Sequence, residues 1–240
     1  MNSASIFRYV LLWIVLGLLV GLLSGAASAI FLITLNWATD YRESHLWIIA
    51  LLPIAGFVIG WSYYRYGENS VKGNNLLLDE LYKTEKPIPL RMTPLVLFGT
   101  ILTHLFGGSA GREGTAVQMG GSLADQLTKY FKLHSEDRRI ILIAGVAGGF
   151  ASVFGTPLAG AIFALEWMQH RKIRWKSLFP ALWTALVANW VCASLFGVGH
   201  THYLVDLVPP HTLVNLLWII PAGIAFGLSG RLFAQSTHFF

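Results

Sequence analysis

The sequence predicts an all-α, polytopic membrane protein in which some helices are broken or end inside the membrane. Three observations predict this fold class. Hydrophobic residues make up 55% of the 240 residues and charged residues only 12%, whereas charged residues form about a quarter of an ordinary soluble domain. Long intervals carry no charge. The 24 glycines and 9 prolines lie in an apolar chain, which favours closely packed and interrupted helices over smooth single spans.

The charge-free intervals locate the predicted membrane segments, because an ionised side chain at bilayer depth is costly. No Asp, Glu, Lys or Arg lies inside the intervals bounded by residues 8–40, 91–112, 139–166, 176–206 and 206–231, and residues 46–64 add another apolar run. A span needs about 20 residues, so roughly six to eight membrane segments are expected. Residues 114–127 form a short segment and Thr156-Pro157 interrupts another, which predicts helices that end within the membrane.

The first apolar interval has the outline of a secretory signal peptide, with Arg8, an apolar run and the small residues 24–29. The apolar run resumes at Ile30, where a mature soluble protein would turn polar, so we expect a membrane span instead. The single cysteine, Cys192, excludes an internal disulfide.

Basic residues at the borders of the apolar intervals explain the net charge of +5 better than nucleic-acid binding does. By the excess of Lys and Arg on cytoplasmic loops, the borders at Arg8, at Arg65 and Lys72, and at residues 171–176 are predicted to face the cytoplasm. Residues 40–45 are then predicted to lie outside. The mixed charges of residues 129–139 leave the side of that loop open.

The segment with the most chemical content is GGSAGREGTAVQ, residues 107–118, between an apolar run and a predicted helix over residues 115–129. A glycine-rich turn leading into a helix leaves backbone N–H groups unpaired at the positive end of the helix dipole, which favours an anion. The carboxylate of Glu113 can compete for the same donors when ionised and leave when protonated. One residue could therefore gate an anion and carry a proton.

Two other interpretations of this segment stay open at this point. The spacing Gly108-x-x-Gly111-x-x-Gly114 superficially resembles a dinucleotide-binding loop, but no strand precedes it. The segment could also be a purely structural loop in which Arg112 and Glu113 pair with each other.

Other candidate sites are weaker. One group of possible metal ligands consists of His200, His202, Asp206 and His211. It could bind a transition metal, but a polar border loop that is rich in histidine explains it better. No metal or other cofactor is therefore expected. The segment 227–230 around Ser229 resembles the serine loop of intramembrane rhomboid proteases, but catalysis would need a histidine base from a facing helix. We therefore do not expect an enzyme.

GREGTAVQ, residues 111–118, resembles the GREGP-x-VQ signature of the CLC family of chloride channels and anion/proton antiporters, and residues 144–150 and 154–166 resemble the glycine-rich helix pair that follows it. The resemblance implies that residues 1–208 are the first repeat of an inverted-repeat fold with re-entrant helices. Residues 211–240 would be the opening helix of the second repeat, left incomplete in this chain. A recurring Gly-x-x-x-Gly pattern, at Gly17 and again at Gly223, agrees with two repeats.

The resemblance also implies site residues. Glu113 matches the gating glutamate of the family, and the anion is expected to be bound by Asn74 and by main-chain amides around the motif, namely those of Gly111, Arg112, Gly114, Thr115, Ala116 and Val117.

Three departures from the family pattern favour one branch. Asn74 stands where the family's GSGIP segment has its serine, Thr115 replaces the proline of GREGP, and Trp167 stands at the antiporters' internal proton-relay glutamate. This combination is similar to the bacterial fluoride/proton antiporter branch. It implies fluoride export across the inner membrane by a homodimeric, multi-pass protein in the lipid bilayer. A chloride channel or chloride/proton antiporter is the alternative.

Overall fold

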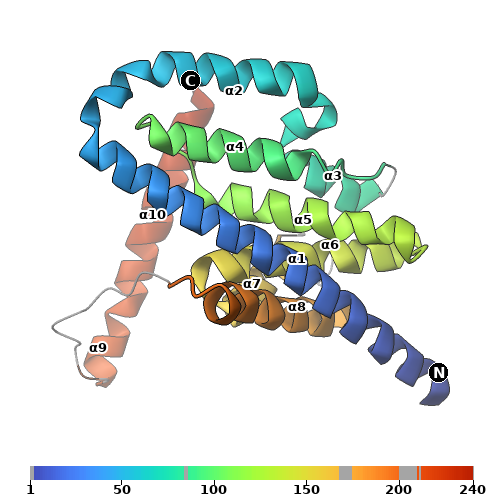
Figure 1. The fold of residues 1–240 in the computed structure, drawn as a ribbon. Coiled ribbons are helices and arrows are strands. Elements are labelled where there is room, and N and C mark those ends of the chain that lie inside the picture. The colour runs from blue at the N-terminus through green and yellow to red at the C-terminus, as the bar shows by residue number, and fades with distance from the viewer. Residues whose placement is uncertain (1–2, 84–85, 168–174, 200–209, 211, 240) are drawn as a thin grey trace. The chain divides into compact units, whose positions relative to one another are not determined.

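The computed structural model describes residues 3–83, 86–167, 175–199, 210 and 212–239. Every element in these ranges is helical, which confirms the predicted all-α class (Figure 1). The α-helices are α1 (Ser3–Ser44), α2 (Leu52–Tyr66), α3 (Asn74–Lys83), α4 (Met92–Leu105), α5 (Arg112–Tyr130), α6 (Ser135–Phe154), α7 (Pro157–Glu166), α8 (Leu178–Trp190), α9 (Leu213–Leu217) and α10 (Ile219–Phe239). Short turns of other helix types are η1 (Leu46–Leu51), η2 (Glu68–Lys72), η3 (Trp175–Ser177) and η4 (Val191–Leu195).

The chain forms two compact units, residues 1–200 and 201–240. In the first unit α1 packs along α4, α5, α6 and α8, and α5 and α6 form an extensively packed pair (Figure 1). The second unit contains α9 and α10. The hydroxyl of Thr212 caps α9 by accepting a hydrogen bond from the Asn215 N–H.

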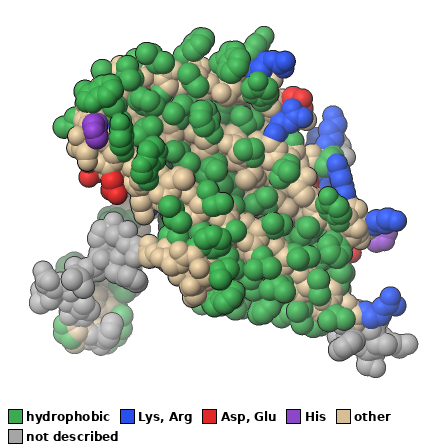
Figure 2. Space-filling model, viewed as in Figure 1, with side chains coloured by type: hydrophobic (Ala, Val, Ile, Leu, Met, Phe, Trp, Pro, Cys, Tyr) green, Lys and Arg blue, Asp and Glu red, His purple; other side chains and the backbone are tan. Residues whose placement is uncertain are grey.

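Within the described residues, four helical segments are long and apolar enough to cross a membrane: Arg8–Ser44, Leu46–Tyr66, Trp175–Leu195 and Leu213–Thr237. Two apolar helices, α4 and α7, are shorter, as expected for helices that end within a membrane. On the face shown in Figure 2, hydrophobic side chains are spread widely and Lys and Arg side chains gather along one edge.

The predicted break at Thr156-Pro157 is confirmed. Helix α6 ends at Phe154, Gly155 adopts the left-handed conformation with φ 70°, and α7 begins at Pro157. Glycine accepts this backbone angle without steric cost, and proline fits the first position of a helix because its missing N–H has no partner there.

Glycines bring helices of the first unit into close contact. A Cβ built on Gly17 would lie 2.5 Å from Trp183 Cδ1, so α1 and α8 approach closely at this glycine. In α5 and α6, Gly120, Gly145 and Gly149 place backbone directly against backbone. No side chain larger than hydrogen fits at these contacts.

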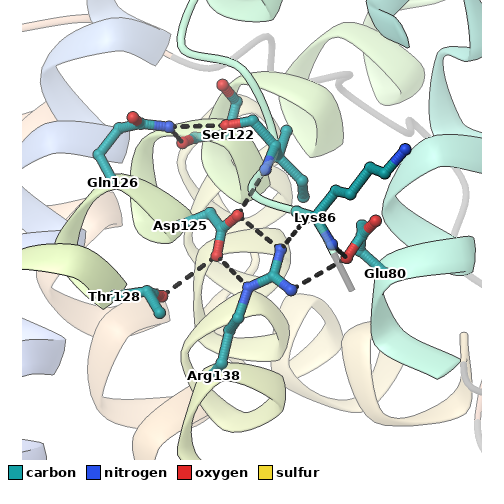
Figure 3. A network of polar contacts seen from close by, with 8 residues as sticks. Glu80, Lys86, Ser122, Asp125, Gln126, Thr128 and Arg138 are labelled. Carbon is teal, nitrogen blue, oxygen red and sulfur yellow. Dashed lines mark hydrogen bonds and ion pairs between the residues drawn. The ribbon is translucent and has the colours of Figure 1, made fainter. Parts of the chain in front are cut away.

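One buried cation joins three helices of this unit (Figure 3). Arg138, in the first turn of α6, pairs with Asp125 on α5 at 2.7 Å and with Glu80 on α3 at 2.9 Å. Burial acts to lower the pKa of Arg138, but hydrogen bonds and charge from Asp125 and Glu80 outweigh it and raise the pKa above its usual value.

This ion-pair group shows on which side of the first unit residues 129–139 lie. Arg138, within this segment, is paired with Glu80 of α3, and α3 begins shortly after Lys72. The α5–α6 connection therefore lies on the same side as the Lys72 border. In Figure 1 the α2–α3 and α5–α6 connections and the N-terminus share one edge of the first unit, and the α1–α2 and α4–α5 connections share the opposite edge.

Candidate anion site

The candidate site is built around the N-terminus of α5. The loop before it is anchored at two points: the ring of His104 donates to the Ala110 carbonyl at 2.9 Å, and Arg42 donates to the His104 carbonyl at 3.2 Å. Gly111 is the N-cap residue, in an extended conformation with φ −74° and ψ 143°. Among the described residues, no side chain accepts a hydrogen bond at this cap.

The helix begins at Arg112, three residues earlier than the predicted start at residue 115. An acidic residue in the first turn is favoured by the helix dipole, and Glu113 supplies one. In an α-helix only the N-cap residue and the first three helical residues have N–H groups without an intrahelical partner. The free donors are therefore those of residues 111–114, and the amides of Thr115, Ala116 and Val117 fall within the bonded part of the helix.

The side chains of these last three residues are buried, and the Thr115 hydroxyl donates to the carbonyl of the N-cap residue Gly111 at 3.3 Å. The Thr115 hydroxyl is buried and lies 2.7 Å from the Thr100 hydroxyl, and Ala116 and Val117 belong to the hydrophobic core. Their contribution is to fix α5 against its neighbours.

Glu113 lies at the exposed start of the helix. Its carboxylate turns back toward the cap, since a Cβ built on Gly111 would lie 2.8 Å from Glu113 Oε2. Gly111, Arg112 and Glu113 are all exposed. Within the described residues no ion pair joins Arg112 to Glu113, so the alternative of a loop closed by that pair is not supported.

A second helix start meets the first one. The left-handed Gly73, with φ 55°, leads into α3, whose first residue is Asn74. A Cβ built on Gly114 would lie 3.4 Å from Asn74 Nδ2, so the absence of a side chain at Gly114 lets the Asn74 amide approach α5. In the part of the chain that the structure describes, Asn74 Oδ1 is buried without a hydrogen-bond partner. The structure thus brings together two predicted site residues that are 40 positions apart in the sequence.

Gln118 borders the candidate site, and the sequence analysis assigned it no role within GREGTAVQ. Its amide nitrogen lies 3.5 Å from a Cβ built on Gly73 and 3.8 Å from one built on Gly114. The helical spacing was an available signal, because residues four apart, such as Gly114 and Gln118, share one face of a helix.

The other candidates gain no support. His200, His202, Asp206 and His211 lie outside the described residues. Among the residues that are described, no group of three metal-ligating side chains occurs. Ser229 lies within α10, and its hydroxyl donates to the Ala225 carbonyl one turn earlier at 2.9 Å.

Comparisons with known proteins identify the family of the chain. The sequence model of the voltage-gated chloride channel family, the CLC family, matches residues 55–240. The chain belongs to this family. A chloride/fluoride channel protein of Pseudomonas syringae pv. tomato is 54% identical to this CLC chain over 237 residues, which cover 99% of the chain and 52% of the relative. A H(+)/Cl(-) exchange transporter of Vibrio vulnificus is 28% identical over 233 residues, covering 91% of the chain and 50% of the relative.

A solved structure shares the fold of this CLC chain. The crystal structure of a CLC-type fluoride/proton antiporter matches with a TM-score of 0.87 and 36% sequence identity, covering 98% of this chain and 58% of that one. The chain spans about half the length of the curated relatives it matches. The resemblance to the CLC family and its fold is therefore confirmed.

Proposed function

We propose that the complete CLC protein exchanges fluoride for protons, with the anion bound where the N-termini of α3 and α5 meet. The proposal is based on the close approach of the two helix N-termini. Asn74 of α3 lies against Gly114 of α5, and the Glu113 carboxylate turns back over the cap of α5. Unpaired N–H groups and the positive end of a helix dipole stabilise an anion at such a position.

Glu113 supplies both the gate and the proton carrier in this proposal. Ionised, its carboxylate competes with the anion for the donors of residues 111–114; protonated, it loses its negative charge and can leave them. Each time an anion replaces the Glu113 side chain at these donors, Glu113 has therefore taken up a proton. No metal or cofactor takes part.

Asn74 is the proposed basis of fluoride preference. Fluoride is small and strongly hydrated, and an amide offers two N–H donors where the serine of other family members offers one hydroxyl. The similarity to a chloride/fluoride channel protein and to a fluoride/proton antiporter supports this choice over chloride exchange.

The resemblance to the family supports three further parts of the proposal. Residues 1–208 form the first repeat and residues 211–240 open the second, the protein works as a homodimer, and it resides in the bacterial inner membrane. Chemical cross-linking in native membranes tests the dimer, and a monomer as the sole species would exclude it.

Ion flux from liposomes containing the complete protein tests the function. We expect fluoride efflux to exceed chloride efflux and to move protons in the opposite direction. Glu113→Gln cannot ionise and should abolish the proton movement, while Asn74→Ser should lower the fluoride preference. Unchanged proton coupling in Glu113→Gln would overturn the mechanism. Chloride efflux equal to or above fluoride efflux in the unmodified protein would favour the chloride antiporter or channel instead.

A further inference from the structure

A buried group of charges ties together the two helices that form the candidate anion site (Figure 3). Arg138 donates from Nε and Nη2 to the two carboxylate oxygens of Asp125 at 2.7 and 2.8 Å. It also donates from Nη1 to Glu80 at 2.9 Å and from Nη2 to the Lys86 carbonyl at 2.6 Å. Asp125 lies on α5 and Glu80 on α3, so one guanidinium bridges both helices.

The excess negative charge of this group is balanced by backbone donors from the segment between α3 and α4. The Ile88 N–H donates to Asp125 at 2.6 Å, and the Lys86 N–H donates to Glu80 at 2.9 Å. The three charged side chains are at most 8% exposed. Through Arg138 of α6 and the Ile88 N–H, these contacts tie α3 and the segment after it to α5.

Helix α3 has ten residues and is held at both ends. Asn74 lies against Gly114 of α5 and Leu77 against Gly121, while Leu76, Leu77 and Leu81 are buried in the core. At the other end Glu80 pairs with Arg138 of α6, and the Tyr82 carbonyl accepts a hydrogen bond from Arg139 at 2.8 Å. Glu80 is six residues from Asn74, which is about 9 Å along a rigid helix. Because Glu80 and Asn74 lie on one short helix, a displacement of α3 at Glu80 is transmitted to Asn74.

We infer that Arg138 is a positioning residue for anion selectivity, because it holds α3 in the register that places Asn74 against Gly114. This inference rests on the proposed function of the site. Arginine suits the role because its planar fork binds Asp125 with two parallel hydrogen bonds and still reaches Glu80 and a carbonyl. A lysine has a single charged nitrogen and cannot reproduce this bridge.

Two neighbouring carboxylates on α3 provide a matched test. Glu80→Gln removes the charge that Arg138 holds, while Asp79→Asn makes the same change at the next residue, whose side chain is 55% exposed and pairs with Lys72. Both variants are made in the complete protein and assayed in liposomes over a range of fluoride and chloride concentrations. Each is first checked for a single gel-filtration peak.

We expect Glu80→Gln to raise the half-saturating fluoride concentration about tenfold and to lower the fluoride-to-chloride preference, with a smaller change in maximal rate. Asp79→Asn should match the unmodified protein in both quantities. Arg138→Lys should resemble Glu80→Gln, and Glu80→Asp, which keeps the charge on a shorter side chain, should recover part of the preference. A purely structural role would lower the amount of active protein and leave the half-saturating concentration unchanged.

A folded Glu80→Gln protein with unmodified half-saturation and preference would overturn the inference. If that variant does not fold, a folded Arg138→Lys protein with unmodified half-saturation and preference would overturn the inference instead. Failure of the proposed function looks different, because the unmodified protein would then show no fluoride flux that depends on Glu113.

Discussion

The polar groups at the two ends of α5 differ in hydrogen bonding. At the C-terminal end both oxygens of Asp125 are bonded, to Arg138, Ile88 and Thr128. At the N-terminal end the amides of residues 111–114 have no partner within the helix, and the Glu113 carboxylate is exposed. A satisfied buried group stabilises one structure, whereas unpaired donors are available to a ligand. With the proposed anion site at its N-terminus, one helix would contribute to stability at one end and to function at the other.

The middle of α5 separates these ends. Gly120 and Gly121 are buried, with Gly120 against the backbone of α6 and Gly121 against Leu77 of α3. Such contacts leave α5 little freedom to slide, because a packed interface resists small displacements. The N-terminal donors are therefore held in place by packing that contains no ligand-binding group.

The largest expected effect comes from the satisfied end. Asp125→Ala leaves Arg138 buried without its bidentate partner, and breaking a buried ion pair in this way costs about 3–5 kcal/mol in the free energy of unfolding. Chemical unfolding of the complete protein in detergent measures it. Asp79→Ala is the control, because an exposed pair contributes at most about 1 kcal/mol. Equal losses in the two variants would contradict the contrast between buried and exposed pairs.

The middle of the helix should respond next most strongly. Gly120→Ala adds a methyl group against the Gly145 backbone, which cannot move aside as a side chain can. Overpacking of this kind costs about 1–3 kcal/mol of unfolding free energy. Gly56→Ala in α2 is the matched control, since a Cβ there meets no atom within 4 Å. The same unfolding experiment compares them, and a Gly120→Ala protein as stable as Gly56→Ala would show that the two backbones are not in contact.

The sequence was sufficient for features that depend on local chemistry. Runs without charge located the long apolar helices, and the pair Thr156-Pro157 located the break between α6 and α7. The start of α5 was placed three residues late, because Gly114 suggests a loop locally while the favourable first-turn position of Glu113 extends the helix.

Features that join distant segments could not be predicted from the sequence. Arg138 and Glu80 are 58 residues apart, and no local pattern selects one partner among the charged residues of a polar border. Asn74 was predicted as a site residue through resemblance, but its contact with Gly114 depends on how α3 and α5 pack. Gln118 was missed for the same reason, because its role depends on what faces it.

Two glutamines on α5 give the smallest expected change in stability. Gln126 belongs to the satisfied end, where it donates to the Ile88 and Ser122 carbonyls, both at 2.9 Å. Gln126→Leu should lose about 1 kcal/mol of unfolding free energy. Its fluoride flux, scaled to the amount of folded protein, should not change. A changed fluoride-to-chloride preference in this variant would mean that the two ends of α5 are not functionally separate.

Gln118→Leu should leave stability nearly unchanged and alter fluoride flux. The Gln118 amide makes no hydrogen bond to any residue that the structure describes, so its loss should change the unfolding free energy by no more than about 0.5 kcal/mol. Next to Gly73 and Gly114, however, its N–H groups are available to an anion. Removing them should raise the half-saturating fluoride concentration several-fold in liposome flux, because the bound anion loses a donor. Unmodified flux together with unmodified stability would remove Gln118 from the site and leave Asn74 as the side-chain amide that meets the start of α5.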